Sequence, residues 1–121
     1  MKQKFTSNGW LVVNKPEGVE SFGVIRKLKF RYQFHKIGFA GTLDPLASGI
    51  LLIGINKATK LIPKIHLYKK SYEVQVRFGA ITPTLDSEGR YTSLDPVAHD
   101  LQDRLHHIKK FIGTYQQKIP N

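Results

Sequence analysis

Short apolar runs in the first two thirds of the chain predict the strands of a sheet. Residues 9–14, GWLVVN, read as a short buried strand that Pro16 and the turn residue Gly18 end. Residues 50–55, ILLIGI, are apolar on both faces of an extended chain, as in a central strand. Residues 72–78, YEVQVRF, alternate cleanly and predict a third strand with one packed face and one wet face.

A different spacing, over residues 21–32, predicts a basic amphipathic helix. Ser21 is suited to cap the N-terminus of this helix. Apolar side chains recur at helical spacing along one face, namely Val24, Ile25, Leu28 and Tyr32. Basic side chains fall largely on other faces, namely Arg26, Lys27 and Arg31. The helix would therefore bury one side and present positive charge elsewhere.

Two further helices are expected later in the chain. Residues 58–67 predict a weaker helix that Pro63 should kink or restart. Asp95 and Pro96 suit the N-cap and first turn of a last helix, which Gly113 should end. The apolar stripe of this helix consists of Val97, Leu101, Leu105, Ile108 and Ile112. Strands mixed with helices, without a regular βαβ rhythm, predict one α+β domain over residues 1–121.

The composition fits a compact soluble protein. Hydrophobic residues make up 40% and aromatic residues 11% of the 121 residues, which is enough to bury a core. The longest apolar stretch, residues 50–55, is too short to span a bilayer, and residues 1–10 hold no apolar run of signal-peptide length. The chain has no cysteine, which excludes disulfides and thiolate metal sites and fits the reducing cytoplasm.

Positive charge is concentrated in the first two thirds of the chain. The formal net charge is +10, and residues 1–79 carry 14 basic and 4 acidic side chains. Residues 80–121 carry 5 of each and are neutral overall. Such a surface attracts polyanions, so nucleic acid is favoured as a partner over an anionic membrane. A soluble basic protein without such a partner is the alternative.

Residues 38–51, GFAGTLDPLASGIL, are the strongest candidate for chemistry. Pro45 disfavours the helical conformation for Asp44, so the carboxylate should sit on a stiff, extended segment. Gly41 would let backbone approach a ligand or another strand closely, and Leu43 would help to wall an apolar pocket in which the carboxylate needs a positive partner. The segment does not match the known phosphate-binding glycine motifs. The spacing leaves two interpretations open: a carboxylate presented for chemistry, or a turn cap.

Four segments, taken in order, resemble the TruB-type tRNA pseudouridine synthases, which isomerise the T-arm uridine of tRNA. These are GWLVVNKPEGVES, KIGFAGTLDPLASGILLIGINKATKL, KKSYEVQVRFGAITPTLDSEG and FIGTYQQKIP. The likeness runs from Gly9 to Pro120, and GTLDPLASG is its most specific part. It implies an α+β pseudouridine synthase-like fold with a mixed, mainly antiparallel sheet and flanking helices.

The resemblance also implies roles for individual residues. Asp44 would be the catalytic nucleophile, and Tyr72 would stack on the flipped base, although Tyr72 could instead be a strand-edge aromatic that packs into the core. Lys15 matches a family position near the active site, with an ordinary surface lysine as the alternative. Phe39, Gly41 and Leu43 would help to bind the substrate. No metal, redox cofactor or nucleotide is required.

Two departures from the family pattern change the expectation. The family usually has a histidine where this chain has Phe39, so a stacking surface is kept and a polar contact is lost. Family members also continue beyond QQKIPN, so the chain would be an N-terminal portion of the catalytic domain. It would then lack the basic residue that pairs with the nucleophile, part of the pocket and the C-terminal RNA-binding extension.

The sequence thus predicts a cytoplasmic protein that binds the T arm of tRNA, with no membrane association. The first interpretation is a pseudouridine synthase whose activity depends on the missing part. The alternative is a non-catalytic basic RNA-binding module or remnant. A complementary chain, or self-association through an open sheet edge, is the further expected partner.

Overall fold

The computed structural model describes residues 3–94 and 100–119, which fall into two compact units, Met1–Val74 and Gln75–Asn121. The first unit contains β1 (Gln3–Phe5), β2 (Gly9–Lys15), α1 (Ser21–Arg31), β3 (Tyr32–Phe34), β4 (Ile37–Phe39), β5 (Gly49–Ile55), the 3₁₀ helix η1 (Asn56–Leu61) and α2 (Ile62–Ile65). The second contains β6 (Ala80–Ile81), β7 (Ser93–Leu94) and α3 (Leu101–Lys109). The expected α+β class is confirmed.

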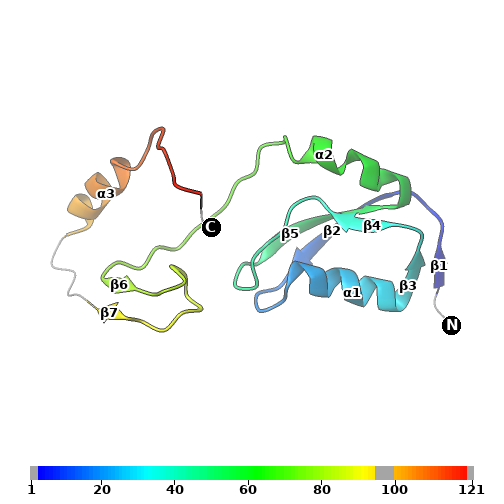
Figure 1. Ribbon diagram of the computed structural model, residues 1–121, viewed down its shortest axis with the longest axis horizontal. Coiled ribbons are helices and arrows are strands. Elements are labelled where there is room, and N and C mark those ends of the chain that lie inside the picture. The colour runs from blue at the N-terminus through cyan, green and yellow to red at the C-terminus, as the bar shows by residue number, and fades with distance from the viewer. Residues whose placement is uncertain (1–2, 95–99, 120–121) are drawn as a thin grey trace. The chain divides into compact units, whose positions relative to one another are not determined.

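An antiparallel sheet in the order β2-β5-β4 is the centre of the first unit (Figure 1). β5 is the middle strand, as the apolar residues on both faces of 50–55 predict, and it begins one residue earlier, at Gly49. Its register places Trp10 of β2 opposite Gly54 and Lys15 opposite Gly49. β1 and β3 form a separate parallel pair, which makes the unit mixed although mainly antiparallel.

The core lies between one face of this sheet and α1. Its buried members are Val24 and Ile25 from α1 and Leu51 and Ile53 from β5. The remaining contacts come from partly buried residues, namely Leu11, Val13, Val19, Leu28, Ile37 and Phe39. α1 covers one face of the sheet and α2 lies on the other side (Figure 1). The predicted helical face is confirmed for Val24, Ile25 and Leu28, and the basic residues Arg26, Lys27 and Arg31 are exposed. Tyr32, which was expected on the same face, lies beyond the helix at the start of β3.

Pro63 restarts the helix after β5, as expected. The 3₁₀ helix η1 ends at Leu61, and Pro63 lies in the first turn of α2, where its missing N–H has no intrahelical partner to lose. Asn56, at the start of η1, has φ 53° and is buried. Its amide accepts from the Lys36 N–H and donates to the Ser7 carbonyl, which ties η1 to the segments before β2 and β4.

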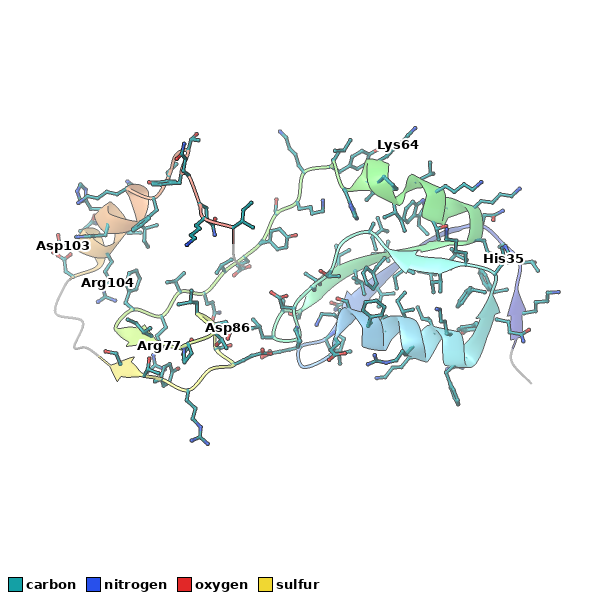
Figure 2. All side chains as sticks on the ribbon, in the orientation of Figure 1. His35, Lys64, Arg77, Asp86, Asp103 and Arg104 are labelled. Atoms are coloured by element: carbon teal, nitrogen blue, oxygen red, sulfur yellow. The ribbon has the colours of Figure 1, made fainter. Side chains whose placement is uncertain are left out.

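The second unit is held by side chains around the short β6–β7 pair. Arg77 donates to the Tyr91 hydroxyl at 2.8 Å, and its guanidinium lies 4.8 Å from the centre of that ring (Figure 2). Arg104 of α3 lies 5.9 Å from the centre of the Phe78 ring. The Asp86 carboxylate accepts from the Thr84 hydroxyl at 2.6 Å and from the Glu88 N–H at 2.9 Å, which closes the loop between the strands.

Three sequence-based predictions about elements need correction or comment. Residues 72–78 are irregular and exposed rather than a strand, and no strand in the described ranges pairs with them, so their alternating face has nothing to pack on. Ser21 does not cap α1, because Glu20 is the N-cap and makes no side-chain capping bond. The predicted cap at Asp95 and Pro96 lies outside the described residues. Asp100 caps α3 instead and accepts from the Asp103 N–H at 2.9 Å.

Of the helices formed by the described residues, none combines the length and apolar character that crossing a bilayer requires.

Candidate active site

Asp44 lies in the loop between β4 and β5, which backbone hydrogen bonds hold in place. The Ala40 N–H donates to the Leu52 carbonyl at 2.8 Å, which continues the β4–β5 ladder into the loop. The Ala47 N–H donates to the Asp44 carbonyl at 3.0 Å, and the Gly18 N–H donates to the Pro45 carbonyl at 2.7 Å. The loop carrying the carboxylate is therefore tied to itself and to the turn after β2.

Gly41 serves this loop through its backbone conformation. Its φ of 96° lies in the region that side-chain-bearing residues rarely adopt. A Cβ added at this position would meet no atom within 4 Å, so the chain itself does not approach Gly41 closely. The glycine is required for the shape of the loop and not for close packing within the protein.

Ser21, the first residue of α1, clamps the loop to the helix. Its hydroxyl accepts from the Leu43 N–H at 2.9 Å and donates to the Leu43 carbonyl at 2.8 Å. Ser21 is buried, and α1 is anchored in the core through Val24 and Ile25. Because Leu43 immediately precedes Asp44, this clamp fixes the catalytic candidate relative to a helix that is anchored in the core.

Lys15 is a buried lysine and not a surface lysine. It ends β2 on the same face as Leu11 and Val13, and its exposed fraction is 0%. Its Nζ donates to the carbonyls of Val19 at 2.6 Å, of Pro16 at 3.0 Å and of Pro45 at 3.4 Å. These acceptors match the three donors of an ammonium group, so the buried side chain is satisfied. Lys15 thus braces the loop one residue after Asp44.

The Asp44 side chain is exposed. Within the described ranges, no group donates a hydrogen bond to its carboxylate and no cation pairs with it. The turn that follows is closed by the backbone carbonyl of Asp44, so the side chain does not act as a cap. The carboxylate is therefore accessible to a ligand that enters the loop.

A cleft of about 220 Å³ opens beside Asp44. Its lining residues are Glu20, Ser21, Phe22, Thr42, Leu43, Asp44 and Pro45. The wall opposite the loop is the first turn of α1, where Phe22 is exposed. Phe22 makes an edge-to-face contact with Phe39 of β4, with ring centres 5.2 Å apart and planes at 87°. The cleft therefore joins a free carboxylate to an exposed aromatic ring.

The structure brings some of the predicted site residues together. Leu43 and Asp44 line the cleft, Phe39 supports its aromatic wall and Lys15 braces its loop. Tyr72 is not among the lining residues, and it is 67% exposed in an irregular segment. In the part of the chain that the structure describes, no group of three or more His, Cys, Asp or Glu side chains could hold a metal ion.

Sequence reasoning missed Ser21 and Phe22 as parts of the site. Ser21 was assigned to a helix cap, which is the usual role of a serine at a helix start. Phe22 is a large apolar residue off the face defined by Val24 and Ile25, but so is the exposed Phe30 of the same helix, so local sequence did not single Phe22 out.

Comparison with known proteins places these residues in a family. Residues 27–121 match the family model described as TruB family pseudouridylate synthase (N terminal domain). The tRNA pseudouridine synthase B of Fusobacterium nucleatum is 41% identical over 112 residues, which cover 93% of this chain and 39% of that protein. The proteins of the same name from Clostridium kluyveri and Cutibacterium acnes are 40% and 43% identical, again over 93% of this chain.

The chain spans about two fifths of the length of the curated relatives it matches. The family match covers Phe39, Asp44 and Tyr72, and it begins after Lys15, Ser21 and Phe22. With a family model matching most of its residues and relatives near 40% identity along nearly its whole length, this chain belongs to the TruB family of pseudouridylate synthases.

Proposed function

We propose that the chain is the N-terminal portion of a catalytic domain that isomerises the T-arm uridine of tRNA to pseudouridine, with Asp44 as the nucleophile. The observation that supports this most directly is the accessible Asp44 carboxylate on a loop that Ser21 and Lys15 brace. The relatives, which are named tRNA pseudouridine synthase B, supply the substrate class. The T arm is proposed as the target because the GTLDPLASG segment resembles the TruB-type enzymes.

The reaction rearranges bonds without consuming another reactant. The bond between the uracil N1 and the ribose C1′ breaks, the base turns, and a bond between C5 and C1′ forms. C5 loses its proton and N1 gains one, so the product has the atoms of the substrate. Asp44 adds to the nucleoside at the ribose or at the base. If it adds at C1′, it is released when the bond between C5 and C1′ forms; if it adds at C6, it is released when C5 loses its proton. The carboxylate is regenerated, as a nucleophilic catalyst requires.

The target base must leave its stack before Asp44 can reach it. An extruded base needs an apolar or aromatic surface to lie on, and we assign this role to Tyr72. In the present fold Tyr72 is exposed in an irregular segment. We propose that the strand expected over residues 72–78 forms when the remaining part of the protein provides a neighbouring strand.

The same dependence applies to the electrostatics of Asp44. No cation among the described residues pairs with its carboxylate. We propose that the rest of the protein supplies the cation that positions Asp44, because the relatives are more than twice the length of this chain. The chain alone should then bind RNA and isomerise it poorly.

Release of tritium from a T-arm RNA that carries 5-tritiated uridine tests this proposal, because the reaction removes the C5 hydrogen. We expect little release with the chain alone. We expect release when the complementary C-terminal part of the Fusobacterium nucleatum relative is added. Losing a preorganised electrostatic partner costs about a hundredfold to a thousandfold in rate.

Asp44→Asn should abolish the release in the reconstituted system and leave RNA binding intact or slightly stronger, because one negative charge is removed. The matched control is Asp103→Asn, which removes the same charge from the exposed helix α3 and should keep full activity. Full activity of Asp44→Asn would refute the nucleophile assignment. RNA binding without any isomerisation in the reconstituted system would favour a non-catalytic RNA-binding module.

A further inference from the structure

Phe22 is held in a fixed position beside Asp44. It follows Ser21, whose hydroxyl bonds both backbone groups of Leu43 at 2.8 and 2.9 Å. The next helical turn is anchored by Val24 and Ile25 in the core. The backbone of Phe22 and the backbone before Asp44 therefore belong to one clamped unit, and both residues line the same cleft.

The ring of Phe22 is restrained as well as its backbone. Phe39 packs against the core and meets the Phe22 ring edge to face, at 5.2 Å and 87°. Edge-to-face pairs are favourable beyond the area that they bury. A ring restrained in this way loses less conformational freedom on meeting a ligand than a free side chain does.

Packing against the protein core does not account for Phe22. The buried residues of α1 are Ser21, Val24 and Ile25, which share one face at spacings of three and four residues. Phe22 lies off that face and is 62% exposed. Its ring therefore keeps a large apolar surface in the cleft, next to the carboxylate of Asp44.

We propose that Phe22, backed by Phe39, is a stacking surface for an unpaired nucleobase of the bound RNA, next to the uridine that Asp44 attacks. This inference rests on the RNA binding of the proposed function. A nucleobase fits because it is flat and aromatic and because the exposed residues further along the same helix, Arg26, Lys27 and Arg31, are cationic. Arg26 lies one turn from Phe22, about 6 Å along the helix axis. Its guanidinium pairs with Glu20 at 3.3 Å, and because this ion pair is exposed and therefore weak, a phosphate attached to the stacked base can compete for Arg26.

The size of the effect follows from known base–aromatic contacts. Removal of an aromatic platform weakens single-strand binding by about 5- to 150-fold per base, and the effect depends on the base and not on the phosphate. Contacts to phosphates contribute equally to the binding of a strand with bases and of an abasic strand. An abasic strand therefore separates the two contributions.

The test measures the affinity of the chain for a uridine decamer and for an abasic RNA strand of the same length, at one salt concentration. Phe22→Leu keeps an apolar side chain and removes the aromatic face, and Phe22→Tyr keeps the face. Phe111→Leu, at an aromatic residue that is 77% exposed in the second unit, is the matched control.

We expect Phe22→Leu to weaken binding of the uridine decamer by about 5- to 150-fold and to leave binding of the abasic strand unchanged. Phe22→Tyr and Phe111→Leu should bind both strands like the wild type. Equal binding by Phe22→Leu and the wild type, or an equal loss for both strands, would overturn the stacking role.

The outcomes separate this inference from the proposed function. If the wild-type chain binds the decamer but Phe22→Leu binds it equally well, only the stacking role fails. If the base-dependent loss occurs while the reconstituted protein releases no tritium, the stacking role stands and the isomerase proposal fails. If the wild type binds neither strand, the RNA-binding premise and this inference fail together.

Discussion

At the scale of single residues, buried polar side chains hold the loop that presents Asp44. Lys15 and Ser21 both reach the loop from other segments and bond backbone groups on either side of that residue. Asn56 likewise forms hydrogen bonds with backbone groups of the segments before β2 and β4 and holds them together. A buried polar group that is fully bonded fixes geometry, and removing one partner leaves the other without a bond.

Ser21→Ala should therefore destabilise the first unit and disorder the Asp44 loop. It leaves the Leu43 N–H and carbonyl without the hydroxyl, which costs about 1–3 kcal/mol when the groups stay buried. We expect a lower denaturation midpoint and a lower kcat in the reconstituted tritium assay. The control is Ser48→Ala, the same substitution at an exposed position of the same loop. An unchanged midpoint for Ser21→Ala would contradict the clamp.

Asp86 allows a prediction about pH. The Thr84 hydroxyl, followed by the backbone N–H groups of Glu88 and Gly89, holds the pKa of the Asp86 carboxyl below its usual range. The hydrogen bonds to the Asp86 carboxylate stabilise the folded loop. Because the folded pKa of Asp86 is lowered, this stabilisation is fully present above the ordinary aspartate pKa of about 3.9 and is lost as the pH falls through the folded pKa. An NMR titration of the Asp86 carboxyl carbon should show a low midpoint, and Thr84→Val should raise it. An equal midpoint in both proteins would refute this cause.

At the scale of elements, the sheet leaves one edge and part of the face opposite α1 open in the first unit. Val12 of β2 and Ile50 of β5 are 69% and 73% exposed on the face away from the core. In the described part of the chain, β2 pairs with β5 alone, so its outer edge has unpaired backbone groups. An exposed edge strand with apolar side chains favours pairing with another chain.

We therefore expect the isolated chain to self-associate more strongly as salt is added, because salt screens the repulsion between highly charged copies. Val12→Lys should reduce this association by placing charge on the edge strand. Leu67→Lys adds the same charge at a residue that is 85% exposed and outside the sheet, and it should have less effect. Sedimentation measures the outcome, and a monomer at both low and high salt would contradict the prediction.

At the scale of the whole molecule, positive charge is distributed unevenly between the first and the last part of the chain. The net charge of +10 arises within residues 1–79, and residues 80–121 are neutral. The basic residues of α1 are exposed, so they can meet phosphates directly. RNA binding should therefore depend on the first part of the chain and on ionic strength.

Affinity for tRNA should fall about a thousandfold between 50 and 200 mM salt if about six phosphates are contacted. Lys27→Glu together with Arg31→Glu should weaken binding to tRNA and to unrelated RNA alike. Lys109→Glu together with Lys110→Glu makes the same change of charge in the second unit and should have a smaller effect. Filter binding over a salt series measures these affinities. Binding that ignores salt would rule out an interface based on phosphates.

The local order of residues predicted much of the first unit. The runs at residues 9–14 and 50–55 became β2 and β5, and the stripe of Val24 and Ile25 became the buried face of α1. These predictions hold because the periodicity of apolar residues reflects which face is buried, which neighbouring residues already determine. The GTLDPLASG segment also identified the family before any geometry was considered.

Other features depended on tertiary structure because they join residues far apart in the chain. Residues 72–78 have the alternation of a strand, but a strand needs a neighbour, and the described residues provide none. Ser21 is 22 residues from Leu43, and Lys15 is 30 residues from Pro45, so local sequence could not reveal those bonds. The sequence alone thus determined α1, β2, β5 and the position of the candidate nucleophile. Only folding decided which hydroxyl, ammonium and aromatic ring surround it, because those contacts exist only once α1 has packed on the sheet.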